Sequence, residues 1–333
     1  MASANLNIFK PQRFEASRII GVFLFLFFPV GSESFAQSEN RLGYFEMDQT
    51  LQTSTGELSG TLTVPILKGT FPVALIIAGS GPTDRNGNNA QMKNNSLQML
   101  AHELAAHGIA SLRYDKRGIG KSASALISEE LLRFENYVED AKAWVSELKT
   151  DSRFRELIII GHSEGSLIGM LASEKADVFV SLAGAGRSID VILKEQLAVQ
   201  LEGKKKLLRA ANEGLAKLKE GKLVEDAPVE LFGLFRPSVQ PYMISWMKYD
   251  PAVEISKLNI PIVIIQGSTD LQVSEEDARL LFEAHRLDSR LIIIEDMNHV
   301  LKIAPLDRTK NIETYSKSEL PLAPELCRVL GAL

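Results

Sequence analysis

The chain contains little of what several protein classes require. Its 333 residues include a single cysteine, Cys327, so no disulfide can form within the chain and the core must stabilise the fold unaided. The formal net charge of -5 gives no support to nucleic-acid binding, which needs a basic face for phosphates. The apolar run near the N-terminus, 19–30, has only twelve residues and is too short to span a bilayer. The sequence therefore predicts no nucleic-acid partner and no stable membrane span.

What is present is the composition of a globular enzyme, with 45% hydrophobic and 24% charged residues. Runs that are apolar on both faces indicate buried parallel strands, and they occur at 73–78, 109–114, 157–160, 178–182, 260–265 and 291–294. Helical patterns lie between most of them, at 92–107, 129–149, 166–174 and 275–285. This alternation predicts an α/β fold with a mostly parallel sheet and helices on both faces.

Two segments depart from that rhythm. Loose alternation over 42–64, with a turn signal at Gly56, predicts an antiparallel hairpin ahead of the parallel strands. Between the strands near residues 183 and 260 the connection is far longer than usual, and 189–219 has the leucine spacing of an amphipathic helix. We therefore expect a helical cap at 187–255, inserted into a core formed by 37–186 and 256–333.

A candidate nucleophile follows the third of the apolar runs. Residues 161–165 read Gly-His-Ser-Glu-Gly, a G-x-S-x-G between a strand and a helix. In that context the motif is a nucleophile elbow, a sharp turn that exposes the serine hydroxyl at the sheet edge. Ser163 is therefore the predicted nucleophile.

A serine hydroxyl needs a base, and the base needs an anion that fixes its tautomer. Of five histidines, His299 lies on a loop just past the last apolar strand, whereas the others fall on helices or, for His162, beside the sheet. Asp270 follows another strand at the same edge, where functional residues of parallel sheets gather. Glu295 and Asp296 are competing acids, but they are too close to His299 in sequence to reach its ring easily. The predicted triad is Ser163, Asp270 and His299.

The triad also needs two N–H donors for the developing oxyanion. The backbone of Glu164, directly after the nucleophile, is one. The glycine-rich loop after the first parallel strand, 78–87, should supply the other from Ser80 or, as an alternative, Gly81. That loop lacks the lysine of a phosphate-binding P-loop.

These features resemble the α/β-hydrolase fold esterases over roughly residues 71–300, apart from the cap. The stretch 115–122, Asp-Lys-Arg-Gly-Ile-Gly-Lys-Ser, is similar to the D-x-R-G-x-G-x-S turn of that family. The loop Gly-Ser-Gly-Pro-Thr-Asp-Arg-Asn-Gly, 79–87, looks like that of a bacterial carboxylesterase subgroup placed with serine aminopeptidase and monoacylglycerol lipase-like hydrolases. The family usually has His-Gly before the oxyanion donor, where this chain has Ala78 and Gly79.

The resemblance implies hydrolysis of carboxylic esters through an acyl-enzyme, without metal or cofactor. Acyl transfer, thioester cleavage or removal of N-terminal residues from peptides would use the same triad; for the last, Glu164 or Asp84 could bind the substrate amine. Aromatic residues near the end of the cap, Phe235, Tyr242 and Trp246, are candidates to line a pocket for esters of short to medium acyl chain. The small-molecule ester is the expected partner, and the sequence does not determine the oligomeric state.

The N-terminus has the pattern of a secretory signal peptide. Lys10, Arg13 and Arg18 precede the short apolar run, and Ser34 and Ala36 place small residues where a signal peptidase reads them. We therefore expect export to the periplasm or the medium, with cleavage after Ala36.

Sequencing the N-terminus of the exported protein tests this expectation. The mature chain should begin at Gln37. A mature chain that begins at Met1 or Ala2 would contradict it.

Overall fold

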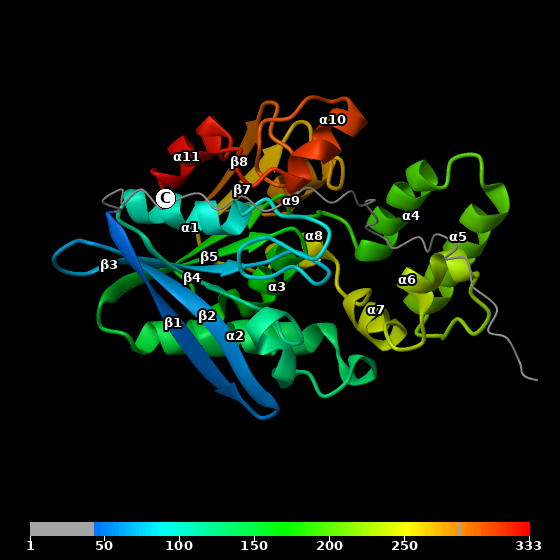
Figure 1. Ribbon diagram of the computed structural model, residues 1–333, viewed down its shortest axis with the longest axis horizontal. Helices are drawn as coiled ribbons and strands as arrows, with labels where there is room; N and C mark the ends of the chain where they lie inside the picture. The colour runs from blue at the N-terminus through cyan, green and yellow to red at the C-terminus, as the bar shows by residue number, and fades with distance from the viewer. Residues whose placement is uncertain (1–42, 286–287) are drawn as a thin grey trace, which may run out of the picture.

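The computed structural model describes residues 43–285 and 288–333, and these contain one eight-stranded sheet. Its strand order is β1-β2-β4-β3-β5-β6-β7-β8 (Figure 1). The strands are β1 (Tyr44–Thr53), β2 (Gly56–Pro65), β3 (Phe71–Ile77), β4 (Ala110–Tyr114), β5 (Phe154–His162), β6 (Val178–Leu182), β7 (Ile262–Gly267) and β8 (Ser289–Ile294). Strands β3 to β8 pair in parallel, whereas the β1–β2 hairpin and the β2–β4 pair are antiparallel. The predicted mostly parallel sheet and leading hairpin are confirmed.

Helices cover both faces of the sheet. They are α1 (Ser96–Ala106), α2 (Phe134–Thr150), α3 (Glu164–Ala172), α4 (Ile189–Gln200), α5 (Lys205–Lys219), α6 (Phe232–Phe235), α7 (Gln240–Trp246), α8 (Pro251–Ile255), α9 (Glu275–Ala284), α10 (Arg308–Glu313) and α11 (Pro324–Leu330). Helices α1 and α11 pack on one face, and α2, α3 and α9 pack on the other (Figure 1). The chain thus forms the three-layer arrangement that its alternating pattern predicts.

The apolar strands explain this layering. Successive side chains of a strand point to opposite faces, so a strand covered on both sides must be apolar at every position. In β5, Ile159 packs with the α2 layer and Ile160 with the α1 layer, and both are fully buried. The same division separates Leu75 from Ile76 in β3.

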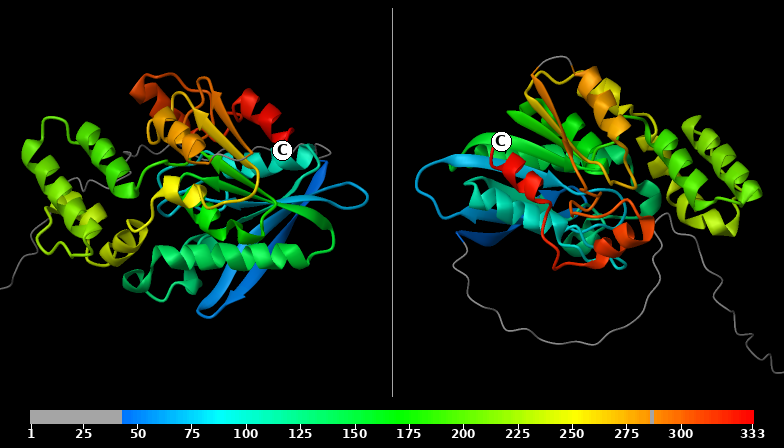
Figure 2. Two further views of the ribbon diagram at one scale, coloured as in Figure 1. Left: turned by 180° about the vertical axis from the view of Figure 1, so that it is seen from behind. Right: turned by 90° about the horizontal axis from the view of Figure 1, so that it is seen from above.

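Helices α4 to α7 lie beyond one end of the sheet, between β6 and β7 in the sequence (Figures 1 and 2). We call residues 187–250 the helical insertion. The predicted helical stretch 189–219 consists of two helices, α4 and α5, separated by a turn that contains Gly203 with a φ of +78°. Lys204 and its two following lysines are exposed, as expected of a solvated face. Helix α8 already packs against α3 and α9, so the chain returns to the core at Pro251, before the expected boundary at 255.

Several hydrogen bonds and ion pairs fasten the insertion to the core, among them Arg187 with Asp277 at 2.9 Å. On one side, the Ser245 hydroxyl accepts a hydrogen bond from the backbone N–H of Phe134 at 2.8 Å, and the Trp246 ring stacks on the Phe134 ring at 5.8 Å. On the other side, Gln196 of α4 donates to the backbone carbonyl of Gln272 at 3.0 Å. Phe134 and Gln272 both lie on or next to loops that follow parallel strands, β4 and β7.

Several helix starts differ from their predicted positions. Helix α1 starts at Ser96 rather than 92, and α2 starts at Phe134 because 129–131 form a separate 3-10 turn. Helix α3 starts at Glu164, two residues earlier than predicted and directly after the candidate nucleophile. The hairpin turns at Ser54 and Thr55, just before the predicted Gly56.

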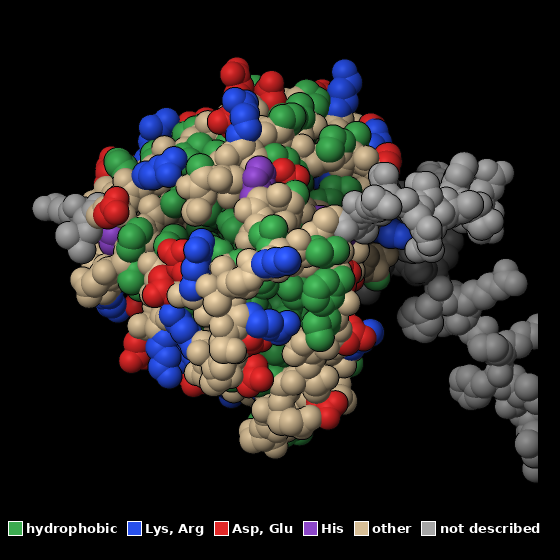
Figure 3. Space-filling model, turned by 90° about the vertical axis from the view of Figure 1, so that its left-hand side faces the viewer, with side chains coloured by type: hydrophobic (Ala, Val, Ile, Leu, Met, Phe, Trp, Pro, Cys, Tyr) green, Lys and Arg blue, Asp and Glu red, His purple; other side chains and the backbone are tan. Residues whose placement is uncertain are grey.

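The surface carries charges of both signs. On the face drawn in Figure 3, acidic and basic side chains are interspersed rather than gathered into one basic patch. None of the helices within 43–285 and 288–333 combines the length and the apolar content that a bilayer crossing requires. The predicted signal peptide, 1–36, lies outside the described residues.

Candidate active site

Ser163 stands in a strained turn between β5 and α3. Its φ of 55° and ψ of -120° place a non-glycine residue in a rarely populated region, which persists only where the surroundings enforce it. The two flanking glycines show what enforces it. A Cβ atom at Gly165 would lie 2.2 Å from the carbonyl oxygen of Ile77, and one at Gly161 would lie 2.2 Å from that of Gly165. The turn therefore has the geometry of the predicted nucleophile elbow.

Asp270 and His299 meet on loops that follow β7 and β8. His299 Nδ1 lies 2.7 Å from Asp270 Oδ2, and both side chains are almost completely buried. The other carboxylate oxygen accepts the backbone N–H groups of Gln272 at 2.7 Å and Val273 at 3.0 Å. These bonds fix the orientation of the Asp270 side chain, as an imidazole partner requires. The competing acids Glu295 and Asp296 are exposed.

Ser163 and His299 both line one cavity of about 570 Å³ between the sheet edge and the insertion. The structure thus brings the three residues of the predicted triad to one place, from sequence positions 107 and 29 residues apart.

His162 contributes to the site in a way that the sequence did not indicate. We expected its side chain to pack beside the sheet, away from Ser163. Instead it lines the cavity, with its ring centre 4.9 Å from that of His299. Its Nε2 lies 2.8 Å from the backbone carbonyl of His299 and donates to it. Burial, with a smaller contribution from the neighbouring imidazole, lowers the pKa of His162 to about 3, so it supports the His299 backbone as a neutral ring.

The candidate oxyanion donors surround Ser163. Glu164 is the first residue of α3, where a backbone N–H has no acceptor within the helix. Ser80 and Gly81 line the cavity on the opposite loop, and a Cβ atom at Gly79 would lie 3.1 Å from Ser163 Cβ. The glycine therefore lets this loop approach the nucleophile.

Two carboxylates anchor the glycine-rich loop 78–87. Asp115 accepts the backbone N–H of Arg85 at 2.8 Å and its guanidinium at 2.7 Å. Asp84 accepts the backbone N–H groups of Asn86 and Asn88. Both carboxylates thus stabilise the loop.

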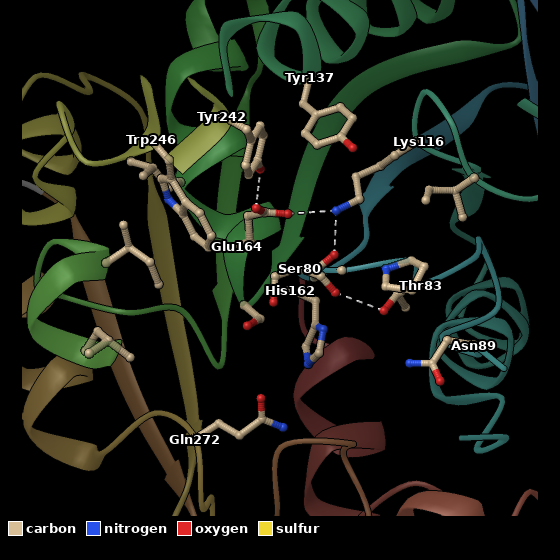
Figure 4. Close-up of a pocket in the computed structure, with 18 of the residues that line it drawn as sticks. Ser80, Thr83, Asn89, Lys116, Tyr137, His162, Glu164, Tyr242, Trp246 and Gln272 are labelled. Atoms are coloured by element: carbon tan, nitrogen blue, oxygen red, sulfur yellow. Dashed lines mark hydrogen bonds and ion pairs between the residues drawn. The ribbon is translucent and has the colours of Figure 1, made fainter. Parts of the chain in front are cut away.

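The side chain of Glu164 is engaged as well (Figure 4). One oxygen pairs with Lys116 Nζ at 2.7 Å, and the other accepts the hydroxyl of Tyr242. Glu164 therefore has no free oxygen to bind a substrate amine, and Asp84 does not line the cavity.

The cavity wall is mainly apolar on the insertion side. Trp246 and Tyr242 line it as predicted, together with Ile192, Leu193 and Met243. The prediction for Phe235 is wrong. Its ring packs inside the insertion, where a Cβ atom on Gly214 of α5 would lie 2.7 Å from it, so its bulk serves the packing of α5 and α6.

Among the described residues, 43–285 and 288–333, no cluster of three or more His, Cys, Asp or Glu is arranged to hold a metal. Cys327 lies on α11 away from the cavity, and burial raises the pKa of its thiol to about 11. A thiol with a raised pKa is a poor nucleophile at neutral pH.

Comparisons with known proteins show which proteins this chain resembles. The family described as serine aminopeptidase, S33 matches residues 91–214, which include Ser163 and Glu164. The chain is 28% identical to esterase EstD of Thermotoga maritima over 250 residues, which make up 73% of this chain and 58% of that relative. The chain thus matches less than two thirds of the relative's length.

Solved structures share the fold. Est1E from Butyrivibrio proteoclasticus, determined with ferulic acid, superposes with a TM-score of 0.54 at 17% identity over 81% of this chain and 96% of its own. The esterase Pf2001 of Pyrococcus furiosus gives 0.53 at 17% identity over 80% and 88%. The chain therefore has the α/β-hydrolase fold.

The buried, neutral His162 predicts acid sensitivity. Its folded pKa lies below the unfolded value near 6.5, so between about pH 3 and pH 6.5 only the unfolded chain binds the proton. The free energy of unfolding must therefore fall as the pH drops through this window, by about 2 kcal/mol between pH 7 and pH 5. In His162→Gln this contribution is absent, because the amide can donate to the same carbonyl without taking up a proton.

Urea unfolding of both proteins at pH 7 and pH 5 measures the difference. His107→Gln, at an exposed position directly after α1, is the control for losing an imidazole elsewhere. Equal losses of stability in the wild type and His162→Gln would contradict the assignment.

Proposed function

We propose that this chain is a serine hydrolase that cleaves carboxylic esters through an acyl-enzyme intermediate. One observation carries the proposal. Ser163, in a turn with positive φ, and His299, paired with the buried Asp270, line the same cavity. The similarity to esterase EstD and to two esterase structures supports the same reaction class.

In the proposed mechanism His299 takes the hydroxyl proton while Ser163 Oγ bonds to the ester carbonyl carbon. Asp270 stabilises the imidazolium that results, and the N–H groups of Ser80 and Glu164 bind the oxyanion. The tetrahedral intermediate collapses as His299 donates its proton to the leaving alcohol. Water then attacks the acyl-enzyme by the same steps and releases the acid.

Two alternatives share these residues. Acyl transfer and thioester cleavage differ only in the acceptor or the leaving group, and no feature of the cavity favours them. An aminopeptidase needs a carboxylate free to bind the substrate amine, and both candidates raised by the sequence are engaged or outside the cavity. We therefore prefer the ester hydrolase.

We also propose that the substrate carries a short to medium acyl chain and that the protein is exported. The first rests on a cavity of about 570 Å³, a size usual for small-molecule sites, closed on one side by Trp246 and Met243. The second rests on the signal-like pattern before residue 37 alone.

Removing the nucleophile tests the proposed function directly. Ser163→Ala should lower kcat/KM for p-nitrophenyl butyrate by roughly 10⁴-fold or more and abolish labelling by a fluorophosphonate probe. Ser173→Ala, which removes a hydroxyl at the end of the same helix by breaking only a bond to the Gly169 carbonyl, is the matched control. If Ser163→Ala retained activity or labelling while folded, the proposed nucleophile would be wrong.

A series of p-nitrophenyl esters from acetate to palmitate tests the substrate class. We expect kcat/KM to peak below about twelve carbons, because the insertion limits the apolar space beside Ser163. Trp246→Ala should move the maximum toward longer chains. A maximum in the wild type beyond about twelve carbons would point to a true lipase instead.

A further inference from the structure

Lys116 is a fully buried lysine beside the candidate nucleophile. It follows β4 by two residues, and its side chain is 1% exposed. A buried ammonium is costly unless its protons are all engaged. Here they face the carbonyl oxygen of Gly79 at 2.6 Å, Glu164 Oε2 at 2.7 Å and the ring of Tyr137, whose centre is 4.8 Å away (Figure 4).

The two hydrogen bonds of Lys116 reach both sides of the proposed oxyanion hole. The carbonyl of Gly79 and the N–H of Ser80 belong to one peptide unit and, in a trans peptide, point in opposite directions. When Lys116 holds that oxygen, it fixes the direction of the Ser80 N–H. The second bond holds the side chain of Glu164, whose backbone N–H is the other proposed donor.

The insertion contributes a third bond to this cluster. The hydroxyl of Tyr242, on α7, donates to the second oxygen of Glu164. Tyr242 also packs edge-on against Tyr137, with ring centres 5.7 Å apart. Both oxygens of Glu164 are thus engaged, one by the core and one by the insertion.

We propose that Lys116 is a positioning residue that sets the distance between the two oxyanion donors, and that Tyr242 links the helical insertion to this setting through Glu164. The inference rests on the proposed function and extends it. Oxyanion donors act on the transition state more than on the bound substrate, so misplacing them lowers kcat and leaves KM nearly unchanged.

A purely structural role for this ion pair would give a different result. Loss of the pair would then reduce stability, with kcat unchanged wherever the protein remains folded. The test therefore compares kcat, KM and stability, and it includes an inhibitor that occupies the oxyanion hole.

The principal variant is Lys116→Met combined with Glu164→Gln, since removing both charges avoids a buried, unpaired carboxylate. We expect kcat for p-nitrophenyl butyrate to fall by roughly 10- to 100-fold with KM within about threefold of the wild type, as a loosened rather than deleted donor pair implies. A trifluoromethyl ketone tests the hole itself, because Ser163 Oγ adds to its carbonyl carbon, His299 takes the proton and the carbonyl oxygen becomes the bound oxyanion. Its inhibition constant should rise by the same factor as kcat/KM falls.

Lys302→Met is the matched control. Lys302 is also fully buried and donates to a backbone carbonyl, that of Leu320, but it does not line the cavity. It should lose thermal stability and keep kcat and the inhibition constant. Tyr242→Phe, which leaves the Lys116–Glu164 pair intact, should show a smaller fall in kcat, of about three- to tenfold, because both oxyanion donors remain and only one support of Glu164 is lost. This variant keeps the test decisive if the double variant does not fold.

If the wild type cleaves esters and both the folded double variant and Tyr242→Phe retain its kcat and inhibition constant, the inference is overturned while the proposed function stands. If the wild type neither cleaves esters nor binds the ketone, the proposed function itself fails and the inference with it.

Discussion

The close packing of α3 against β3 is the constraint on which the site depends. The backbone of Gly165 approaches the carbonyl of Ile77 so closely that no side chain fits between them. The turn before it must therefore be tight, and Ser163 takes a positive φ that a serine would otherwise avoid. The burial of α3 against the sheet offsets the conformational cost of this positive φ. The same contact brings the start of α3, and with it the N–H of Glu164, next to the loop that carries Ser80.

Three consecutive charged residues after β4 organise the surroundings of that turn. Asp115 binds Arg85 of the glycine-rich loop, Lys116 binds Glu164, and Arg117 binds Asp140 of α2. Each of these pairs is largely buried, and each connects a different segment to the same short stretch of chain. Breaking one partner of a buried pair is strongly destabilising, so this arrangement keeps the loops in one relative position. The D-x-R-G turn of the sequence thus acts as a structural junction that joins three segments.

The sequence predicted the parts of the fold that local pattern determines. Continuous apolar runs identified the buried strands, and Ser163, Asp270 and His299 were predicted to lie together because each follows such a run at the same edge of the sheet. Side-chain contacts that no motif or strand end indicates were not predictable. The Lys116–Glu164 pair joins a loop to a helix 48 residues later. Phe235 was misplaced because an aromatic residue in an insertion can face either the cavity or its own helices, and the break between α4 and α5 was missed because apolar spacing continues across Gly203.

Two of the contacts between the insertion and the core have a consequence for how the protein would behave while a substrate enters. One contact, from Gln196 to the carbonyl of Gln272, lies two residues from Asp270, and the other, from Tyr242, lies on Glu164. Lifting the insertion would release the acid loop and the oxyanion side together. An open conformation would thus be inactive, and ester cleavage would take place only in the closed conformation, from which bulk water is excluded.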